Sequence, residues 1–292
     1  KPDYPDAYNN MGIALQDKGD LEAALDSYKQ ALKIKPDYAE AYSNMGNTQK
    51  DKGDLEAAIE SFKQALKIKP DLAEANHMLS SLTGKTTIAA PRDYVEGLFD
   101  KYASKFENSL VNELEYRIPK LLADIVVANR THGSLGSVLD IGCGTGLTGI
   151  ELREFCQTLE GIDLSKFMLE KARFKKVYDK LGHTDITEYL SAADLDFDYY
   201  VSTDVFIYVG DLTEIFRLIK SRNKRSGKLV FSTEHIEGDG FILETSGRYS
   251  HSKKYIENLC QKFDYRISHF EKADLRKEKN KFLTGGLYLL DF

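Results

Sequence analysis

Two short apolar runs lie on either side of a stretch with helical spacing between residues 138 and 163. Residues 138–141 form a short, mainly apolar run of the kind that fills a buried parallel strand. Apolar side chains then recur at helical spacing from residue 147 to residue 156, and residues 159–163 form a second short run. The pattern therefore predicts the strand, turn, helix and strand of an open α/β sheet.

Further apolar runs continue this pattern towards the end of the chain. Residues 197–205 predict a fourth strand with Asp204 at its carboxyl end, and residues 229–234 predict a fifth strand. The remaining expected elements are a helix around residues 215–219 and late strands around residues 265–270 and 286–292, the last of them antiparallel.

The first 69 residues contain nearly the same sequence twice, with a period of 34. Residues 2–35 recur as residues 36–69, so that the tripeptide starting at Asn10 recurs at Asn44. In each copy small residues stand where two helices would cross, and a Gly-Asp pair breaks and re-caps the chain between the helices. The pattern resembles the tetratricopeptide repeat (TPR), a helix–turn–helix unit that stacks into a solenoid.

A third copy of the repeat begins at residue 70 and loses the pattern after Leu82. Residues 83–92 contain Thr, Gly and Pro without a helical period, which is typical of a linker. We therefore expect two full repeats and a capping helix in residues 1–82, a linker in residues 83–92 and a second domain in residues 93–292. Because a stable stack needs about three units and the chain starts at a repeat boundary, we expect further repeats upstream in the intact protein.

Two helices are predicted between the linker and the first strand. Residues 94–106 place aromatic and aliphatic side chains on one helical stripe. Residues 110–128 form a longer amphipathic pattern, in which Pro119 predicts a kink.

The composition is that of an ordinary globular protein, with 42% hydrophobic and 29% charged residues. The net charge of −6 and a pI near 5.6 argue against a nucleic-acid partner, which requires a basic face. No apolar run is long enough to cross a bilayer, so we expect no membrane partner and a cytoplasmic location. The three cysteines have neither disulfide nor metal-ligand spacing, and no metal is expected.

Three glycines at alternate positions, Gly142, Gly144 and Gly146, follow the first strand. Glycine lets a backbone approach a ligand closely, and Asp163 at the end of the second strand could accept both hydroxyls of a ribose. The spacing G-x-G-x-G, with Asp140 two residues before it, favours a cofactor without phosphate over a dinucleotide, whose fingerprint is G-x-G-x-x-G. A dinucleotide site and a tight turn without any ligand are the alternatives.

This stretch resembles motif I of class I S-adenosylmethionine (SAM) methyltransferases. The resemblance implies an α/β, Rossmann-like, seven-stranded fold preceded by the all-α repeat segment, with SAM as cofactor and S-adenosylhomocysteine (SAH) as product. Residues 183–190 are similar to that family's third-strand region, which reads the adenine, and a surface N-cap at Asp185 is the alternative. Residues 94–106 resemble the segment that covers the SAM pocket, and a helix that packs its aromatic side chains on the sheet is the alternative. The cofactor-binding residues that the resemblance implies are Asp140, Gly142, Cys143, Gly144, Gly146, Leu147, Asp163, Leu164, Met168, Asp185, Ile186, Asp204 and Tyr102.

Residues 246–252 follow the fifth strand, where this superfamily places substrate-specific insertions. They resemble the G-R-Y-x-H segment of a bacterial group of predicted methyltransferases fused to tetratricopeptide repeats. Arg248 could pair with a carboxylate or phosphate, and His251 could act as a general base, with Glu234 and Asp204 as the next candidates. A loop held by its own polar contacts is the alternative. The substrate-binding candidates are Arg248, Tyr249 and Tyr208.

Asn10 and Asn44 occupy matching positions in the two repeats. In some tetratricopeptide proteins an asparagine there holds an extended peptide, and an exposed polar residue is the alternative. The sequence thus predicts a SAM-dependent methyltransferase that acts on an O, N or S atom of a small-molecule or peptide acceptor and binds a protein partner through its repeats. The alternative is a scaffold whose methyltransferase-like domain binds SAM without turnover.

Overall fold

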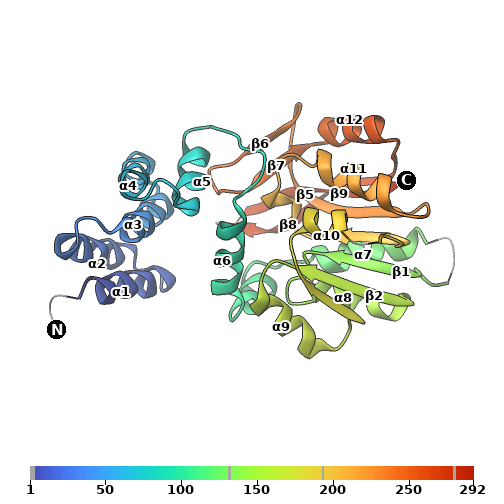
Figure 1. The fold of residues 1–292 in the computed structure, drawn as a ribbon, viewed down its shortest axis with the longest axis horizontal. Coiled ribbons are helices and arrows are strands. Elements are labelled where there is room, and N and C mark those ends of the chain that lie inside the picture. The colour runs from blue at the N-terminus through green and yellow to red at the C-terminus, as the bar shows by residue number, and fades with distance from the viewer. Residues whose placement is uncertain (1–3, 131–132, 193, 279–280) are drawn as a thin grey trace. The chain divides into compact units, whose positions relative to one another are not determined.

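The computed structural model describes residues 4–130, 133–192, 194–278 and 281–292 (Figure 1). The chain divides into two compact units. The first comprises Lys1–Thr87 together with Leu243–Gly247, and the second comprises Ile88–Ile242 and Arg248–Phe292. In the described part of the chain, no helix is both long and apolar enough to cross a membrane.

The first unit is built from paired antiparallel helices. Asp20 and Asp54 start the second helix of each pair, where each carboxylate accepts a hydrogen bond from a backbone N–H three residues later. The helices of a pair cross closely because Gly12 faces the ring of Tyr28, where a Cβ would lie 2.5 Å from Cε1. The helices are α1 (Pro5–Asp17), α2 (Leu21–Ile34), α3 (Ala39–Lys52), α4 (Leu55–Ile68) and α5 (Ala73–Leu82).

The second unit opens with two helices and a π-helical turn rather than the two helices that the sequence predicts. α6 (Arg92–Tyr102) is followed by η1 (Asn108–Glu113) and α7 (Ile118–Ala128). The predicted kink at Pro119 is wrong. The chain leaves the helical conformation before Ile118, and the proline lies in the first turn of α7, where its missing N–H costs no helical hydrogen bond.

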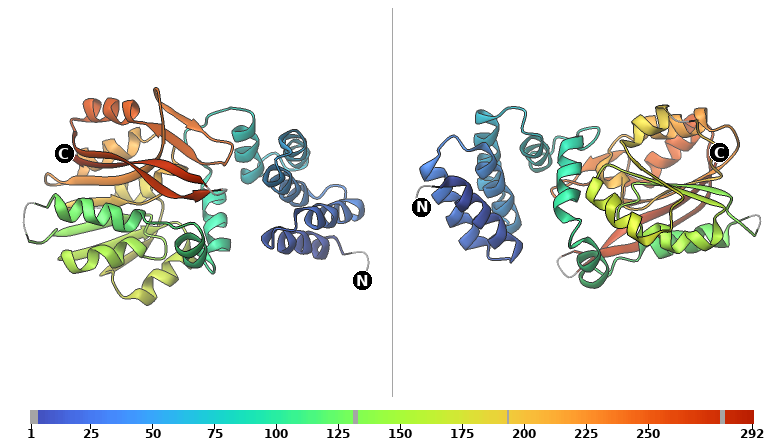
Figure 2. Two further views of the ribbon diagram at one scale, coloured as in Figure 1. Left: turned by 180° about the vertical axis from the view of Figure 1, so that it is seen from behind. Right: turned by 60° about the horizontal axis from the view of Figure 1, so that its bottom comes forward.

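A mixed β-sheet forms the centre of the second unit (Figure 2). Its order along the main path is β3-β2-β1-β4-β5-β7-β6; β9 pairs antiparallel with β5, and β8 pairs with β9. The short strands β6 and β7 add to the seven strands that the sequence predicts. The strands are β1 (Ser137–Ile141), β2 (Thr158–Asp163), β3 (Lys180–His183), β4 (Tyr199–Ser202), β5 (Lys228–Ile236), β6 (Phe241–Leu243), β7 (Tyr249–Ser252), β8 (Arg266–Glu278) and β9 (Lys281–Asp291).

Apolar clusters cover both faces of the sheet, which is why its central strands are buried throughout. One cluster joins the sheet to the helices α10, α11 and α12, and the other joins it to α7 and α8. Because β1, β2, β4 and β5 run parallel, their carboxyl ends lie along one edge of the sheet. The helices and short helical turns that follow β1 are α8 (Leu147–Leu152), η2 (Arg153–Phe155), α9 (Lys166–Lys175), α10 (Ile186–Ala192), η3 (Phe206–Tyr208), α11 (Thr213–Arg222) and α12 (Lys253–Phe263).

Candidate functional site

The glycine turn after β1 takes a conformation that other residues rarely adopt. Gly142, Gly144 and Gly146 have φ values of 68°, 53° and 90°. A Cβ at Gly142 would lie 2.3 Å from Cγ2 of Val205, so this glycine is required by packing. A Cβ at Gly144 would meet no heavy atom within 4 Å, so the backbone of this residue borders open space.

Asp163, at the end of β2, holds this turn in place. Its Oδ2 accepts a hydrogen bond from the backbone N–H of Gly144 (2.8 Å), and its Oδ1 accepts one from the backbone N–H of Ser165 (2.8 Å). Burial raises the pKa of Asp163 to about 6. The carboxylate thus connects the glycine turn to the start of α9.

Asp140 is buried beneath the same turn. Its Oδ2 accepts a hydrogen bond from the hydroxyl of Tyr178 (2.7 Å), whereas its Oδ1 has no partner among the described residues. Burial raises the pKa of Asp140 to about 7. A buried carboxylate oxygen without a partner is costly, and a cationic ligand would offset that cost.

Ser165 connects the start of α9 to α6. We call the region formed by the glycine turn, Asp140, Asp163 and the start of α9 the cofactor end. Its hydroxyl accepts from the backbone N–H of Met168 and donates to Oδ1 of Asp100 at 2.6 Å. Tyr102 lies two residues further along α6, where its ring meets the edge of Phe106. α6, which corresponds to the helix predicted in residues 94–106, is therefore joined to the start of α9 by a side-chain hydrogen bond.

The other predicted cofactor residues lie along the same stretch. The backbone N–H of Cys143 donates to the carbonyl of Ile162, and His183 Nε2 lies 2.8 Å from the carbonyl oxygen of Leu164. Leu147 begins α8. Met168 is buried in the first turn of α9.

Asp185 acts as a helix cap in the structure. Its Oδ1 accepts hydrogen bonds from the backbone N–H and the hydroxyl of Thr187 and from the backbone N–H of Glu188. This is the surface-cap role that the sequence leaves open for such an acid. An adenine contact by Asp185 and Ile186 stays a prediction.

A second group of functional candidates lies at the carboxyl ends of β4 and β5. Nη1 of Arg276 donates to Asp204 Oδ2 (2.6 Å), and Nη2 of the same side chain donates to Glu234 Oε1 (2.5 Å). Arg248 Nε donates to the same Glu234 oxygen (2.5 Å), and Arg248 Nη2 donates to Glu278 Oε2 (2.5 Å). We call these five side chains the charged cluster.

The backbone supports this charged cluster in two unusual ways. Asp204 has a φ of 53°, and the hydroxyl of Ser232 accepts from its N–H and donates to its carboxylate. A register shift between Asp274 and Arg276 marks a β-bulge in β8, so that Leu275 and Arg276 are both buried although they are neighbours. The bulge thus turns Arg276 towards the carboxylates.

Tyr208 lies near the charged cluster. Burial raises its pKa to about 12, and the charges of Arg248, Arg276, Asp204 and Glu234 also act on it. Its ring meets the edge of Phe99 on α6 at 5.3 Å between centroids. Tyr208 therefore remains a candidate for substrate binding.

His251 and Tyr249 lie in the interior rather than at the site. His251 has no exposed surface, its Nε2 lies 2.9 Å from the carbonyl oxygen of Gly210, and burial lowers its pKa to about 4. Tyr249 is also fully buried, and its ring covers Gly210, where a Cβ would lie 2.7 Å from Cε1. Both side chains are buried, which argues against a general base at His251 and against substrate binding by Tyr249.

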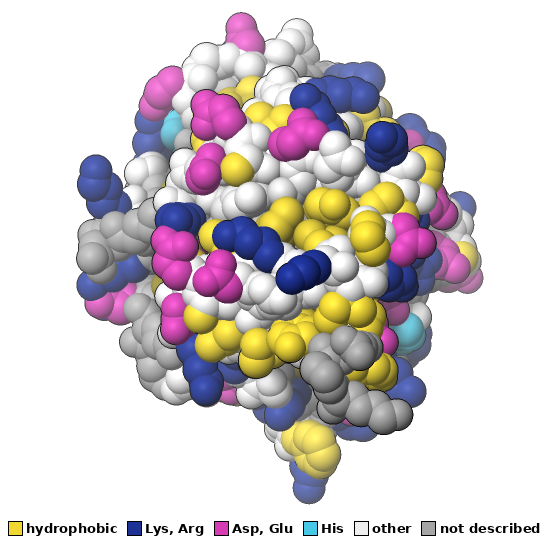
Figure 3. All heavy atoms as spheres, turned by 90° about the vertical axis from the view of Figure 1, so that its left-hand side faces the viewer, with side chains coloured by type: hydrophobic (Ala, Val, Ile, Leu, Met, Phe, Trp, Pro, Cys, Tyr) yellow, Lys and Arg dark blue, Asp and Glu magenta, His cyan; other side chains and the backbone are white. Residues whose placement is uncertain are grey.

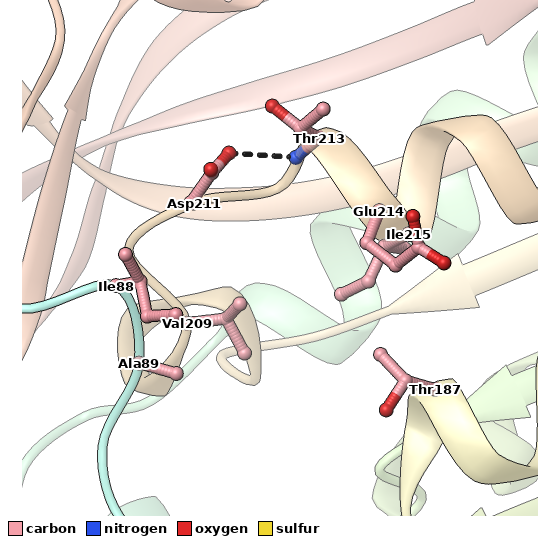
Figure 4. A pocket seen from close by; sticks show the side chains of 8 residues that line it. All are labelled: Ile88, Ala89, Thr187, Val209, Asp211, Thr213, Glu214 and Ile215. Carbon is pink, nitrogen blue, oxygen red and sulfur yellow. Dashed lines mark hydrogen bonds between the residues drawn. The ribbon is translucent and has the colours of Figure 1, made fainter.

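A separate pocket of about 400 Å³ lies beside η3 and the first turns of α10 and α11 (Figure 4). Asp211, which lines it, accepts hydrogen bonds from the backbone N–H of Thr213 and from the hydroxyl of Tyr255 and so caps α11. None of the predicted site residues lines this pocket. Its lining consists of Ile88, Ala89, Thr187, Val209, Asp211, Thr213, Glu214 and Ile215.

The two asparagines of the repeats differ in their surroundings. Asn10 is exposed, whereas the side-chain amide of Asn44 donates to Oδ1 of Asn9 at 2.9 Å and joins α3 to α1. Figure 3 shows the side that lies at the left of Figure 1, where acidic, basic and apolar side chains are interspersed. Peptide binding by Asn10 and Asn44 stays a prediction, since the Asn44 amide already serves a contact between repeats.

Two residues that shape the cofactor end were not predicted as site residues. Tyr178 lies 38 positions from Asp140, and no local motif links them. Asp100 lies inside the aromatic segment before the core, so its acid next to Phe99 was the available signal. In the described part of the chain, no group of three or more His, Cys, Asp or Glu side chains is arranged to hold a metal ion.

Comparison with known families agrees with this architecture. A family model described as a methyltransferase domain matches residues 132–284, which is more than half of the chain. Models described as a TPR repeat and a tetratricopeptide repeat match residues 14–53 and 39–72. The chain therefore belongs to the methyltransferase domain family and carries tetratricopeptide repeats before that domain.

Individual relatives match parts of the chain. Methyltransferase-like protein 27 of Homo sapiens is 36% identical over 89 residues, which cover 29% of this chain and 35% of the relative. A ubiquinone biosynthesis O-methyltransferase of Coxiella burnetii is 25% identical over 157 residues, which cover 53% of this chain and 64% of the relative. The chain thus spans less than two thirds of the length of these curated relatives.

A solved structure shares the fold of the second unit. Magnesium protoporphyrin IX methyltransferase from Synechocystis PCC 6803 with bound SAH superposes with a TM-score of 0.53 at 15% identity, covering 68% of this chain and 98% of that chain. At this identity the likeness concerns the fold alone.

Proposed function

We propose that this chain transfers the methyl group of SAM to an O, N or S atom of a small-molecule or peptide acceptor bound at the carboxyl ends of β4 and β5. The observation that carries the proposal is the charged cluster. Four of its five side chains, those of Asp204, Glu234, Arg248 and Arg276, come from separate strands or strand ends and converge at the edge where open α/β sheets bind ligands. Buried ionic groups gathered at that edge are more typical of a site than of packing.

We assign SAM to the neighbouring end of β1 and β2. The open space at Gly144 leaves room for a ligand against the backbone, and the unpartnered Oδ1 of Asp140 suits a cation. We assign the ribose to Asp163, whose two carboxylate oxygens are aligned by backbone N–H groups. When bound, SAM supplies an activated methyl group on a sulfonium, whose positive charge these two carboxylates favour.

In this assignment the residues of the chain mainly position the acceptor. The carboxylates of Asp204 and Glu234 accept hydrogen bonds from arginines, so they are better suited to fixing orientation than to removing a proton. The ring of Tyr208 packs against Phe99 of α6 beside the charged cluster. A base is needed only if the acceptor arrives protonated.

The repeats are assigned to protein binding. Tetratricopeptide repeats present a concave surface on which a peptide segment of a partner could lie, and exposed Asn10 is the better candidate of the two asparagines. The runner-up function is a scaffold that binds SAM without turnover. Location in the cytoplasm stays a prediction from the sequence.

The test combines binding with turnover. SAM and SAH are titrated calorimetrically into the full chain, and tritium transfer from [methyl-³H]SAM to bacterial extracts is counted. Asp163→Ala is expected to weaken SAM binding by about 100-fold or more, because it removes two hydrogen bonds to a charged group as well as the ribose contact.

Asp179→Ala is the matched control. Asp179 accepts a backbone N–H and an arginine at the opposite end of β2, so its loss should leave SAM affinity within about twofold. Unchanged SAM binding by Asp163→Ala would show that the cofactor site is misassigned. Tight SAM binding without any methyl transfer would favour the scaffold.

A further inference from the structure

The charged cluster is unevenly exposed to water. The side chains of Glu234, Arg276 and Asp204 are 5%, 8% and 13% exposed, whereas that of Glu278 is 40% exposed. Arg248, at 19%, lies between the two groups and binds a buried carboxylate with Nε and the exposed one with Nη2. Glu278 and the outer side of Arg248 are therefore the parts of the cluster that an incoming molecule meets first.

We propose that the acceptor is a carboxylate, and that it binds by replacing Glu278 on the Nη2 side of Arg248. This inference rests on the proposed methyl transfer at the ends of β4 and β5. The inference restricts the acceptor from any O, N or S nucleophile to a carboxylate. It also assigns to Arg248 the role of binding that carboxylate.

Replacing the carboxylate of Glu278 by that of the acceptor costs little free energy. Glu278 is the more exposed end of its pair with Arg248, so water can hydrate its carboxylate when it leaves, and its departure costs less than that of a buried carboxylate. Two guanidinium groups and three carboxylates give the cluster one net negative charge, and the exchange keeps that balance. Because Nε of Arg248 stays bound to Glu234, the guanidinium keeps its orientation while its outer edge presents a geometry suited to carboxylates.

The chemistry of a carboxylate acceptor also fits the surrounding groups. A lone pair of the carboxylate oxygen forms the new C–O bond to the methyl carbon as the C–S bond breaks, and the electron pair of that bond stays on sulfur to give SAH. No proton is released, so no base is required. This matches the placement of His251 on the carbonyl of Gly210 and of Asp204 and Glu234 on arginines.

Product release follows from the same contacts. The methyl ester carries no charge, so it loses the ionic part of its attraction to Arg248. Glu278, the last residue of β8, can then return to Nη2 of Arg248. An amine, hydroxyl or thiol acceptor would arrive with a proton to lose and would have no reason to displace Glu278.

The test uses the chemical lability of the product. The full chain is incubated with [methyl-³H]SAM and either a protein-free bacterial extract or a tryptic digest of bacterial protein. Total transferred tritium is counted first, and the fraction released as volatile methanol by mild base is counted second, because base hydrolyses methyl esters and leaves N-methyl, S-methyl and methyl ether groups intact. We expect most of the transferred tritium to be released.

Arg248→Gln is expected to lower the base-labile counts at least tenfold while SAH binding stays within twofold of the unchanged chain. Base-stable counts would overturn the carboxylate acceptor and leave the proposed methyl transfer standing. Base-labile counts that survive in Arg248→Gln and Arg248→Lys would overturn the anchoring role. Bound SAH without transfer to either fraction would overturn the proposed function and this inference with it.

A second variant tests the displacement of Glu278. Glu278→Gln removes the competing charge, so the KM for the acceptor fraction should fall threefold to tenfold with kcat unchanged. The matched control is Glu237→Gln, since Glu237 is an exposed acid paired with Lys272 outside the cluster; its KM should not change. A raised KM in Glu278→Gln would mean that Glu278 assists binding, and the exchange model would be wrong.

Discussion

The two ends of the site along the edge of the sheet are built in different ways. At the cofactor end, the contacts run between backbone N–H groups and carboxylates within a short stretch of chain, as in the bonds from Gly144 and Ser165 to Asp163. At the acceptor end, the contacts run between charged side chains from β5, β8 and the residues beside β4 and β7, so that Asp204 and Arg276 lie 72 positions apart.

This difference determines which residue substitutions each end of the site can tolerate. The turn at the cofactor end, to which we assign SAM, needs positive φ at three glycines, so its backbone leaves little room for substitution. A cluster of side chains can be exchanged residue by residue without altering the sheet, which suits a site that selects one acceptor. The comparison predicts that substitutions at the acceptor end change stability through buried charge, whereas those at the cofactor end act through backbone conformation.

The largest effect is expected at Arg276. Arg276→Met takes from buried Asp204 the arginine that it pairs with and leaves buried Glu234 paired with Arg248 alone, and breaking such a pair costs about 3–5 kcal/mol. Urea unfolding at pH 7 measures the loss. Adding Asp204→Asn and Glu234→Gln to Arg276→Met should recover much of it, since the uncompensated charges are then gone.

Arg266→Met is the control for that comparison. Arg266 lies on the same strand and pairs with Asp291, but its side chain is 81% exposed, so the loss should stay below about 1 kcal/mol. Equal losses for the two arginines would contradict the view that burial of charge governs the acceptor end.

Two glycine variants test whether the backbone at the cofactor end serves folding or ligand binding. Gly142→Ala combines a positive φ with a clash against Val205 and should destabilise the chain by about 2–4 kcal/mol. Gly144→Ala meets no protein atom, so it should cost only about 1 kcal/mol but weaken SAM binding by about tenfold or more, because its Cβ would take up space assigned to the ligand. Thermal unfolding and SAM titration of both variants separate the two effects; SAM affinity unchanged in Gly144→Ala would remove the ligand from this position.

The contrast also explains which features could be predicted from the sequence. The repeats, the alternation of strands and helices and the glycine turn depend on neighbours within about 35 residues, and the pattern of small, apolar and capping residues carries that information. The break between η1 and α7 could not be predicted in this way, because Pro119 is compatible with a kink or with a helix start and only the packing of α7 decides between them.

The acceptor end shows most clearly what could not be predicted from the sequence. His251 follows an arginine and a tyrosine in a segment typical of a site, yet the rings of Phe241 and Tyr255 pack against it and the carbonyl of Gly210 takes its Nε2. Those partners are distant in sequence or belong to elements whose placement only the fold defines. The bulge that turns Arg276 inward could not be predicted either. Strand alternation in the sequence would place Leu275 and Arg276 on opposite faces of the sheet.

The smallest effect concerns the hydrogen bond between Tyr178 and Asp140. Asp140 has a pKa near 7, well above that of an unfolded aspartate, so the folded chain takes up a proton and loses stability as the pH rises from about 4 to about 7. Positively charged SAM favours the ionised form, so its affinity should increase as the pH rises through 7. The hydroxyl of Tyr178 lowers this pKa, and Tyr178→Phe should move the midpoint upward by about one pH unit.

SAM titrations between pH 5 and pH 9 measure that midpoint, and two variants locate it. Asp140→Asn should abolish the step near pH 7 and leave a step near pH 6 from Asp163. Tyr189→Phe removes a comparable tyrosine–carboxylate contact, to Glu160, at a distance from the glycine turn and should leave the midpoint in place. If Tyr178→Phe lowers SAM affinity equally at every pH, then Tyr178 acts only by packing on Gly149 and Gly161, and the cofactor end depends on its backbone alone.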